Sequence, residues 1–266
     1  MMSEVELRER FCPDGSLLRR QQERMFEMLL VFDEICRRHN IPYWLSSGTL
    51  LGAVRHGGFI PWDDDMDVEM LRQDYLRLLE VLPGELPENL AWQSHETDPN
   101  YFFSFGKLRD RRSHLEETNR YDRVFKEQGI FIDVFVLERS PLWLHKLSCD
   151  TLGHVYKILR TSTDDEKAMR SVLRWHKFNH GLLYPVFRFL SRFSSKEFVR
   201  HTFGVPYHGP RRLADVFPLS VAQFEGHEFP VPHDCHAYLT RMFGDYMKLP
   251  DLDDIHPHVG TLTIEE

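Results

Sequence analysis

Cysteine is scarce in this chain of 266 residues, which contains four. Cys12, Cys36, Cys149 and Cys235 are far apart and form no paired motif, so the sequence indicates a reduced, cytoplasmic compartment rather than a disulfide framework. No apolar stretch is long enough to span a membrane. The charged segment 1–10 also lacks the apolar core of a signal peptide. We find no internal repeat and no low-complexity segment.

Positive charge is in the minority. The chain has 33 Lys and Arg against 41 Asp and Glu, which gives a net charge of −8. This balance argues against general nucleic-acid binding. A hydrophobic content of 42% and a charged content of 28% are ordinary for a globular protein. A chain of this length can bury a core for one large domain or for one and a half.

The most informative feature is the acidic run at residues 62–68, which places four carboxylates within five positions and is predicted to end as a strand. In a strand Asp65 and Asp67 would point to one face, while Met66 and Val68 would point to a core. Two adjacent carboxylates repel each other unless a cation lies between them. The pair therefore predicts a site for a hard divalent ion shared with substrate phosphates. A solvated acidic turn is the alternative interpretation.

A glycine turn precedes the acidic run. Residues 43–47 are predicted to form a short buried strand, and residues 50–55 one or two helical turns. Ser47, Gly48 and Thr49 lie between them. Glycine lets the backbone approach a ligand closely, and a helix N-terminus presents free N–H groups. We therefore expect these three residues to cradle phosphate.

One charge interrupts the apolar strand predicted at residues 130–136. Burying an unpaired carboxylate is costly, so Asp133 should have a partner. A salt bridge to a nearby Lys or Arg is one interpretation. The other is a third carboxylate of the metal site, on a strand next to Asp65 and Asp67.

Basic residues end a second alternating segment. One face of the strand predicted at residues 101–109 changes from aromatic to basic, and it ends in Lys107 and Arg109. These side chains are candidates for phosphate contacts, for which the planar fork of Arg is well suited. Neutralisation of the acidic strand or simple solvation is the alternative. Arg55, at the end of the helix after the glycine turn, is a similar candidate.

The coarse organisation is mixed. We expect helices at residues 16–39, 73–82 and 235–243 and short strands within 223–231. The region 141–204 is predicted to be helical with breaks at Gly153 and Pro185. Within it, residues 151–200 hold ten Lys or Arg and four Asp or Glu, a net charge of +6, together with many aromatic residues. A packed lobe with solvated basic residues and a surface for an anionic membrane or acceptor both fit this composition.

Residues 47–68, SGTLLGAVRHGGFIPWDDDMDV, resemble the signature of the LicD family, bacterial phosphocholine transferases related to fukutin and fukutin-related protein. Three shorter segments are also similar to that family: KLRD at 107–110, GIFIDVF at 129–135 and FGDYMKLP at 243–250. Residues 141–205 show no matching motif.

The resemblance implies a fold and a division of the chain. The fold is an α/β (α+β) nucleotidyltransferase-fold mixed sheet with an inserted helical lobe. Residues 1–266 would form a single domain of this kind. Its expected parts are an N-terminal helix at 1–40, a catalytic sheet at 41–140, the helical lobe at 141–205, and C-terminal strands and a helix at 206–266.

The resemblance also implies a reaction. It is the transfer of a phospho-alcohol, with phosphocholine the best fit, from a CDP-activated donor to a cell-surface glycan such as lipopolysaccharide or teichoic acid. CDP-ribitol and CDP-glycerol are related donors, and the acceptor can be a lipid-linked glycan met at the inner membrane face. The resemblance assigns Mg²⁺ or Mn²⁺ to Asp65, Asp67 and Asp133. Lys107 and Arg109 would stabilise the departing CMP.

Two alternatives belong to the same fold. Nucleotidyl transfer to a small molecule such as an antibiotic would release pyrophosphate, and a non-catalytic binding module should have lost a carboxylate. The C-terminus departs from the family pattern, because three aspartates follow Pro250 where a basic position is expected. These are Asp251, Asp253 and Asp254, and they precede His256 and His258.

Overall fold

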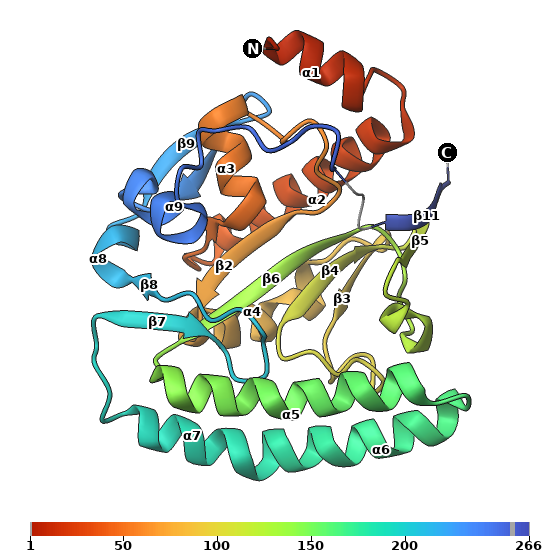
Figure 1. Ribbon diagram of the computed structural model, residues 1–266, viewed down its shortest axis with the longest axis vertical. Coiled ribbons are helices and arrows are strands. Elements are labelled where there is room, and N and C mark those ends of the chain that lie inside the picture. The colour runs from red at the N-terminus through yellow and green to blue at the C-terminus, as the bar shows by residue number, and fades with distance from the viewer. Residues whose placement is uncertain (1, 256–258, 266) are drawn as a thin grey trace.

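The computed structural model describes residues 2–255 and 259–265 and shows a mixed sheet flanked by helices (Figure 1). His256 and His258 lie outside the described residues. The strand order is β1–β2–β6–β4–β3, with β7 pairing with β6 and β8 with β7. These strands are β1 (Trp44–Leu45), β2 (Asp67–Leu71), β3 (Leu90–Gln93), β4 (Gly106–Asp110), β6 (Phe131–Glu138), β7 (Phe198–His201) and β8 (Arg211–Arg212). The predicted α/β (α+β) class is confirmed.

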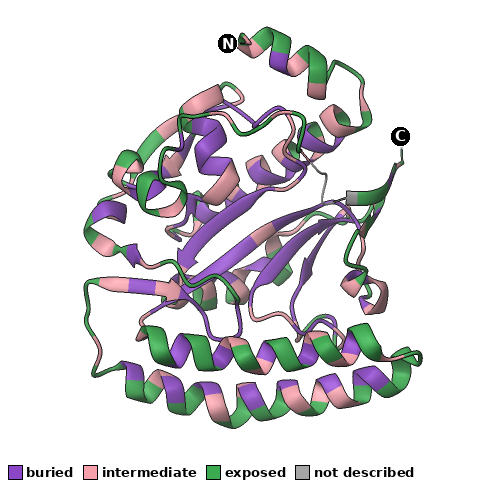
Figure 2. Ribbon diagram, viewed as in Figure 1, coloured by how far each residue is buried: buried purple, intermediate pink, exposed green. Residues whose placement is uncertain are grey.

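Strands β2 and β6 are parallel, and the other neighbours in this sheet are antiparallel. The parallel register places Asp67 opposite Asp133. A parallel pair needs a long crossover, and here the crossover consists of α4 (Arg72–Glu85), β3, β4 and β5 (Ser113–Glu117). Figure 2 shows that the central strands are almost entirely buried. Asp67 and Asp133 are therefore neighbours on adjacent strands in the middle of the sheet.

Two of the helices predicted from the spacing of apolar residues pack near this sheet. Helix α2 (Leu17–Arg38) begins at Ser16, whose side chain accepts a hydrogen bond from the Arg19 N–H, and it buries Met25, Leu29 and Phe32. Helix α4 extends beyond its predicted end and includes Pro83. A proline near a helix C-terminus removes only one hydrogen bond, and buried Leu78 and Leu82 hold this turn in place.

The helical lobe, residues 142–191, consists of α5 (Leu142–Thr161) and a second, continuous helix antiparallel to it (Figure 1). That helix comprises α6 (Asp165–Phe178), the π-helical turn η2 (Asn179–Leu183) and α7 (Tyr184–Ser191). The predicted breaks at Gly153 and Pro185 are wrong. Helix α5 runs through Gly153. Pro185 is accommodated because η2 widens the helix just before it, with the Tyr184 N–H donating to the Asn179 carbonyl.

The strand predicted at residues 101–109 is shorter in the structure and begins at Gly106. Tyr101 and Phe102 instead pack with the helical lobe in a separate apolar cluster, so burial of their rings replaces strand pairing. Gly106 is required where the strand begins, because a Cβ there would lie 2.1 Å from the Trp92 ring. The aromatic segment therefore joins the sheet to the lobe.

The remaining elements lie around the sheet. They are α1 (Glu4–Phe11), α3 (Ser47–His56), η1 (Tyr121–Val124), α8 (Leu213–Val216), β9 (Ser220–Phe224), β10 (His227–Val231), α9 (Cys235–Phe243) and β11 (Val259–Ile264). Strands β9 and β10 form a hairpin, and β11 pairs with β5. The predicted helix 235–243 is confirmed. Among the described residues, none of the helices combines the length and the apolar character needed to cross a bilayer.

A buried ionic cluster ties this C-terminal part to the sheet. Glu69 on β2 is 0% exposed, and its carboxylate accepts hydrogen bonds from Arg211 Nη2 at 2.7 Å and from Trp44 Nε1 at 3.1 Å. The Tyr238 hydroxyl on α9 also donates to it. His201 lies 3.3 Å from the same carboxylate. One buried charge thus connects β1, β2, β7, β8 and α9.

Glu69→Gln should lower the free energy of unfolding by about 3–5 kcal/mol, because it leaves the Arg211 charge buried without its partner. Urea unfolding at neutral pH measures the change. Glu197→Gln is the matched control, since it removes the exposed ion pair with Arg212 and should cost less than about 1 kcal/mol. Equal effects of the two substitutions would contradict the role of Glu69.

The same contribution should depend on pH. Burial alone would raise the pKa of Glu69, but the Arg211 charge and the adjacent His201 hold it at about 2, below the ordinary value of 4.5. A carboxylate with a depressed folded-state pKa stabilises the fold above its unfolded-state pKa and loses this effect as the pH falls through the folded-state value. The difference between the parent and Glu69→Gln should therefore be constant above about pH 4.5 and shrink toward pH 2.

Candidate active site

A cavity of about 580 Å³ opens where β2 and β6 meet the C-terminal part of the chain. Acidic residues and the glycine turn are part of its lining: Ser47, Gly48, Asp63, Asp65, Asp67 and Asp133. Basic and aromatic residues from distant segments also line it: Tyr207, His208, Arg212, Arg241 and Phe243. The cavity thus brings a group of carboxylates and cationic side chains together.

Backbone hydrogen bonds fix the two strand carboxylates. The Asp67 N–H donates to Thr49 Oγ1 at 2.8 Å, and the Asp133 N–H donates to the Met66 carbonyl at 2.8 Å. Strand β2 begins only at Asp67, so Asp65 lies in the preceding loop. The prediction that Asp65 shares a strand face with Asp67 is therefore wrong. Both residues still line the same cavity.

The carboxylates affect one another electrostatically. Burial raises the pKa of Asp67 well above its ordinary value, and the charges of Asp65 and Asp133 raise it further. Asp63 behaves in the same way, through burial and then through Asp65 and Asp64. Four acidic groups around one cavity therefore favour either bound protons or a bound cation.

Asp133 has both kinds of neighbour that the sequence allowed, a basic side chain and the other carboxylates. It lines the cavity beside the other carboxylates, and its Oδ1 atom lies 3.0 Å from Lys107 Nζ. Burial raises the pKa of Asp133 to about 6, although Lys107 opposes this shift. Lys107 also lies 3.4 Å from Glu117 and over the ring of Phe131. A carboxylate with a pKa near neutrality suits proton transfer.

Three predicted binding residues lie elsewhere. Lys107 does not line the cavity and acts on it through Asp133. Arg109 is 0% exposed and donates to Gln93 Oε1 at 2.8 Å and to the Gly129 carbonyl at 2.7 Å, so its predicted phosphate contact is wrong. Arg55 also does not line the cavity, and its Nη1 donates to the Tyr246 carbonyl at 2.9 Å.

The glycine turn has the predicted strand–turn–helix form. Ser47 adopts a left-handed conformation with φ of +48°, an uncommon geometry for a residue other than glycine and one associated with functional sites. A Cβ at Gly48 would lie 2.7 Å from Asp63 Oδ2, so any other residue there would have to displace that carboxylate. Thr49 is buried and holds the start of β2 rather than lining the cavity. Ser47 and Gly48 alone remain available to a ligand.

Our sequence analysis missed the cationic side of the cavity. Tyr207 and His208 belong to a Pro- and Gly-containing loop at residues 206–210, which leads directly into the pair Arg211–Arg212. A turn-rich segment followed by two arginines was the available signal. Arg241 on α9 carried no comparable signal, since only the fold brings it to the cavity.

This arrangement defines a class of protein. Carboxylates on adjacent strands of a mixed sheet, next to a glycine turn at a helix start, are the arrangement expected of a nucleotidyltransferase fold. Comparison with known proteins shows which family the chain resembles. Residues 40–140 match the family described as LicD/FKTN/FKRP, nucleotidyltransferase domain. This part of the chain is therefore similar to the domain of that family.

Individual relatives extend the match. The chain is 29% identical over 263 residues to the Lipopolysaccharide cholinephosphotransferase LicD of Haemophilus influenzae, covering 91% of this chain and 95% of that protein. It is 53% identical over 34 residues to the human Ribitol 5-phosphate transferase FKRP and 39% identical over 54 residues to the mouse Ribitol-5-phosphate transferase FKTN. The chain spans only 7% and 12% of those two proteins.

In metal-free buffer, Asp67→Asn should raise the melting temperature, because it removes one of several like charges around the cavity. A gain of about 1 kcal/mol corresponds to roughly 2–4 °C for a chain of this size. Thermal unfolding with a chelator measures it. Asp251→Asn, at an exposed position, serves as the control. A lower melting temperature for Asp67→Asn than for the parent would show that the carboxylates do not repel one another.

Proposed function

We propose that this protein transfers a phospho-alcohol group, most suitably phosphocholine, from a CDP-activated donor to a hydroxyl of a cell-surface glycan. The observation that carries the proposal is the parallel pairing that sets Asp67 opposite Asp133 in a cavity shared with Asp65. The nearly full-length relative named as a lipopolysaccharide cholinephosphotransferase supports phosphocholine and lipopolysaccharide. The ribitol phosphate transferases support CDP-ribitol as a related donor.

The carboxylates fit a hard divalent cation. Asp65, Asp67 and Asp133 offer only oxygen ligands, as Mg²⁺ and Mn²⁺ prefer, and their mutual repulsion would be relieved by a positive ion. These three residues would hold the ion. When bound, it neutralises negative charge on the donor diphosphate.

The transfer would proceed with Asp133 as the proton acceptor. The acceptor hydroxyl oxygen forms a bond to the phosphorus that carries the alcohol. The bond from that phosphorus to the bridging oxygen breaks, and CMP leaves with the electron pair. The hydroxyl proton passes to Asp133, whose carboxylate Lys107 holds in position. Orientation and charge neutralisation supply most of the catalysis in reactions of this type.

Arginines of the cavity lining are better placed for phosphate than Arg109. Arg212 is held by Glu197 at 2.8 Å, and Arg241 is held by Asp215 at 3.0 Å. Both line the cavity and are partly exposed. A planar guanidinium binds phosphate oxygens through two parallel hydrogen bonds, so these two residues would contact the diphosphate.

Incubation with CDP-choline, CDP-ribitol or CDP-glycerol, Mg²⁺ and a glycan acceptor should release CMP from one of the donors. Asp67→Asn and Asp133→Asn should each lower kcat by roughly a hundredfold or more, comparable to the loss of an electrostatic catalytic group. Arg241→Ala should raise KM for the donor by roughly tenfold or more, because it removes a charge-assisted phosphate contact. Nucleotide chromatography of the released CMP measures the rates of the parent and of the three variants.

Asp251→Asn is the matched control and should retain the parent rate. Release of pyrophosphate from a nucleoside triphosphate, rather than CMP from a CDP-alcohol, would show nucleotidyl transfer to a small molecule. Donor binding without turnover of any acceptor would favour a binding module. Undiminished turnover by Asp67→Asn at saturating Mg²⁺ would refute the metal assignment.

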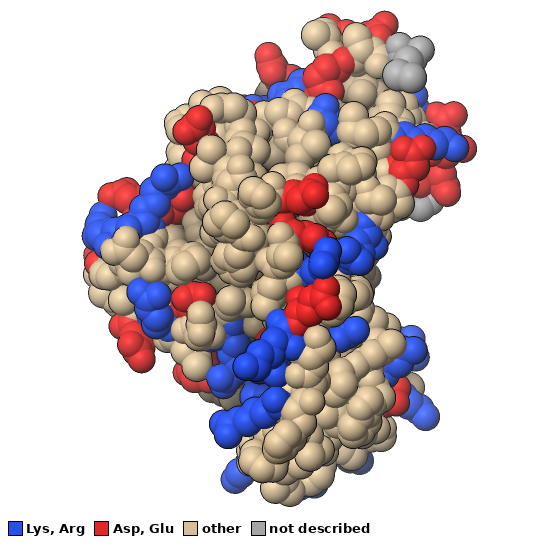
Figure 3. Space-filling view, turned by 90° about the vertical axis from the view of Figure 1, so that its left-hand side faces the viewer, with Lys and Arg blue, Asp and Glu red and all other residues tan. Residues whose placement is uncertain are grey.

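The helical lobe also presents an apolar surface with a basic border, which bears on how an acceptor is reached. Its exposed large side chains follow one face of the continuous helix: Phe178, Leu182, Val186, Phe189 and Leu190. Phe193, which is 80% exposed, lies just beyond the end of this helix. Trp143 and Leu147 of α5 are also exposed. Figure 3 shows this lobe as a largely uncharged surface bordered by Lys and Arg.

We propose that this apolar face binds an anionic membrane surface. Residues 167–196 contain seven Lys or Arg and no Asp or Glu, so the charge complements anionic lipid headgroups. Contiguous exposed apolar residues with such flanks are typical of helices that lie in a membrane interface. Phe187 is buried, and Arg188 pairs with Glu138 at 2.7 Å, so neither belongs to this face.

Vesicles of phosphatidylcholine and phosphatidylglycerol should co-sediment with the protein at low salt and less so at high salt, because surface charge is screened within about 8 Å at physiological ionic strength. Replacing Lys177, Arg192 and Lys196 with Gln should reduce binding. Replacing Arg20, Lys126 and Lys248 with Gln makes the same charge change on exposed positions elsewhere and should not.

Substitution of Leu182, Phe189 and Phe193 by Ser tests the apolar part and should weaken binding at both salt concentrations. Equal binding by the two charge variants would refute the proposed surface. If the parent instead forms an oligomer that the serine variant dissociates, the face is an interface between copies of this chain.

A further inference from the structure

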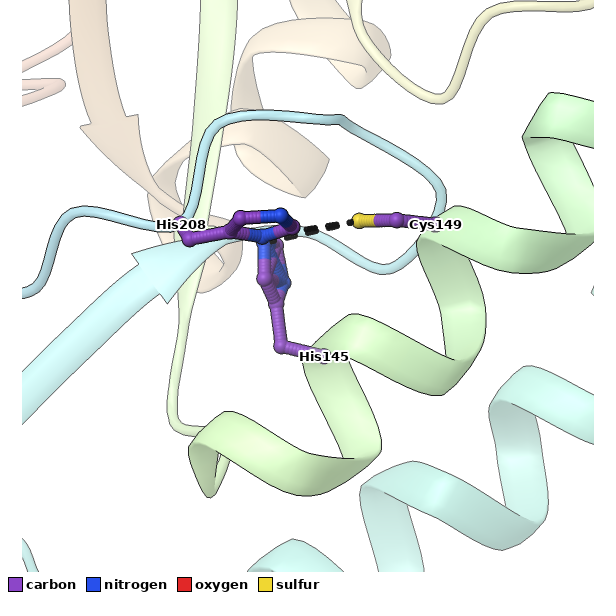
Figure 4. Close-up of side chains that lie close together, drawn as sticks. All are labelled: His145, Cys149 and His208. Carbon is purple, nitrogen blue, oxygen red and sulfur yellow. Dashed lines mark hydrogen bonds between the residues drawn. The ribbon is translucent and has the colours of Figure 1, made fainter.

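A second group of potential metal ligands lies beside the cavity, with different chemistry from the carboxylates. His145 and Cys149 project from α5, and His208 projects from the loop before β8 (Figure 4). Cys149 Sγ lies 3.8 Å from His208 Nδ1 and 3.9 Å from His145 Nε2. One ligand atom from each of the three residues lies within 4.8 Å of the other two.

These separations fit a tetrahedral ion. Zinc binds sulfur at about 2.3 Å and histidine nitrogen at about 2.0–2.1 Å, so the two ligand atoms in a tetrahedral site are roughly 3.6 Å apart. Both sulfur–nitrogen distances are within a few tenths of an ångström of that value. The spacing of four residues puts His145 and Cys149 on one face of α5. Only a small movement of the exposed His208 ring would close the site.

The buried histidine holds one ligand atom in place. His145 is 0% exposed, and its Nε2 atom, which lies near Cys149, is also 3.0 Å from the Tyr207 carbonyl. Among the described residues, its Nδ1 atom is buried and has no hydrogen-bond partner. Zn²⁺ at Nε2 would replace the contact with Tyr207, and the ring proton would then lie on Nδ1. It would also replace the contact of Cys149 Sγ with the Val205 carbonyl at 3.2 Å.

We propose that His145, Cys149 and His208 bind one Zn²⁺ ion, with the fourth position open toward the cavity that His208 lines. Two imidazoles and a thiolate select zinc or a similar transition metal, whereas the carboxylates select Mg²⁺ or Mn²⁺. The Cys149 thiol loses its proton to solvent when its sulfur binds. This proposal does not rest on the proposed transferase activity.

The ion would join two parts of the molecule. It would fasten α5 of the helical lobe to the loop at residues 206–210, which supplies Tyr207 and His208 to the cavity. Zinc binding should therefore order the cationic side of the cavity relative to the lobe. Metal removal should increase amide hydrogen exchange in this loop more than in the central strands.

The test uses full-length, untagged protein freed of metal by a chelator. Titration with Zn²⁺ against a chromogenic chelator should give one tightly bound ion per chain. Cys149→Ser and His208→Ala should each weaken binding by roughly a hundredfold or more. Substitution by Co²⁺ should give a sulfur-to-metal absorption band that Cys149→Ser abolishes. His208 is exposed, so its variant should fold even if substitution of a buried ligand does not.

Matched controls use the same residue types outside the cluster. Cys235→Ser, with its sulfur near the Pro232 carbonyl, and His154→Gln, exposed on α5, should bind zinc like the parent. Asp67→Asn should also keep zinc while losing activity, which separates this site from the carboxylates. A stoichiometry far below one ion per chain, or unchanged affinity in Cys149→Ser and His208→Ala, would overturn the proposal.

Discussion

The parallel pairing of β2 with β6 is the constraint on which the candidate site depends. It sets Asp67 opposite Asp133 across one step of the sheet, where neither carboxylate can move away from the other. The Thr49 hydroxyl fixes the β2 side of this pair, and the Met66 carbonyl accepts the hydrogen bond that fixes the β6 side. Repulsion is thus built into the backbone. The structure can relieve it by binding protons, by binding a cation, or by the ion pair with Lys107.

The Glu69 cluster shows how the same strand serves a second purpose. Asp67 and Glu69 are two residues apart on β2, so both project from one face. Glu69 has full ionic and hydrogen-bonded compensation from Arg211 and Tyr238, whereas Asp67 lies among other acids. The compensated charge brings β8 and α9 to the sheet, and with them Arg212 and Arg241. A buried charge whose partners Arg211 and Tyr238 line the cavity therefore positions its cationic residues.

Sequence reasoning located the acidic half of the site and missed the other half for a physical reason. The paired carboxylates and the glycine turn form continuous local patterns, so Asp65, Asp67, Ser47 and Gly48 could be placed together from their spacing, whereas Asp133 was assigned to them by the resemblance to a known family. The direction of the Arg109 side chain, near the buried end of β4, could not be predicted in this way. Arg109 donates a hydrogen bond to the Gly129 carbonyl inside the sheet. The alternation of residues along a strand does not reveal which face of that strand a later segment will cover. Tyr207, His208 and Arg241 reach the cavity through long-range packing alone.

The lobe illustrates the same limit at the level of helices. Gly153 and Pro185 are breakers by local propensity, yet both lie within helices, because packing against Tyr101 and Phe102 stabilises the lobe and the π-helical turn absorbs the missing hydrogen bond. That continuity has a functional consequence. An uninterrupted helix keeps its exposed apolar residues from Phe178 to Leu190 on one face, whereas two broken segments would point them in different directions. The turn that accommodates the proline thus makes this apolar face continuous.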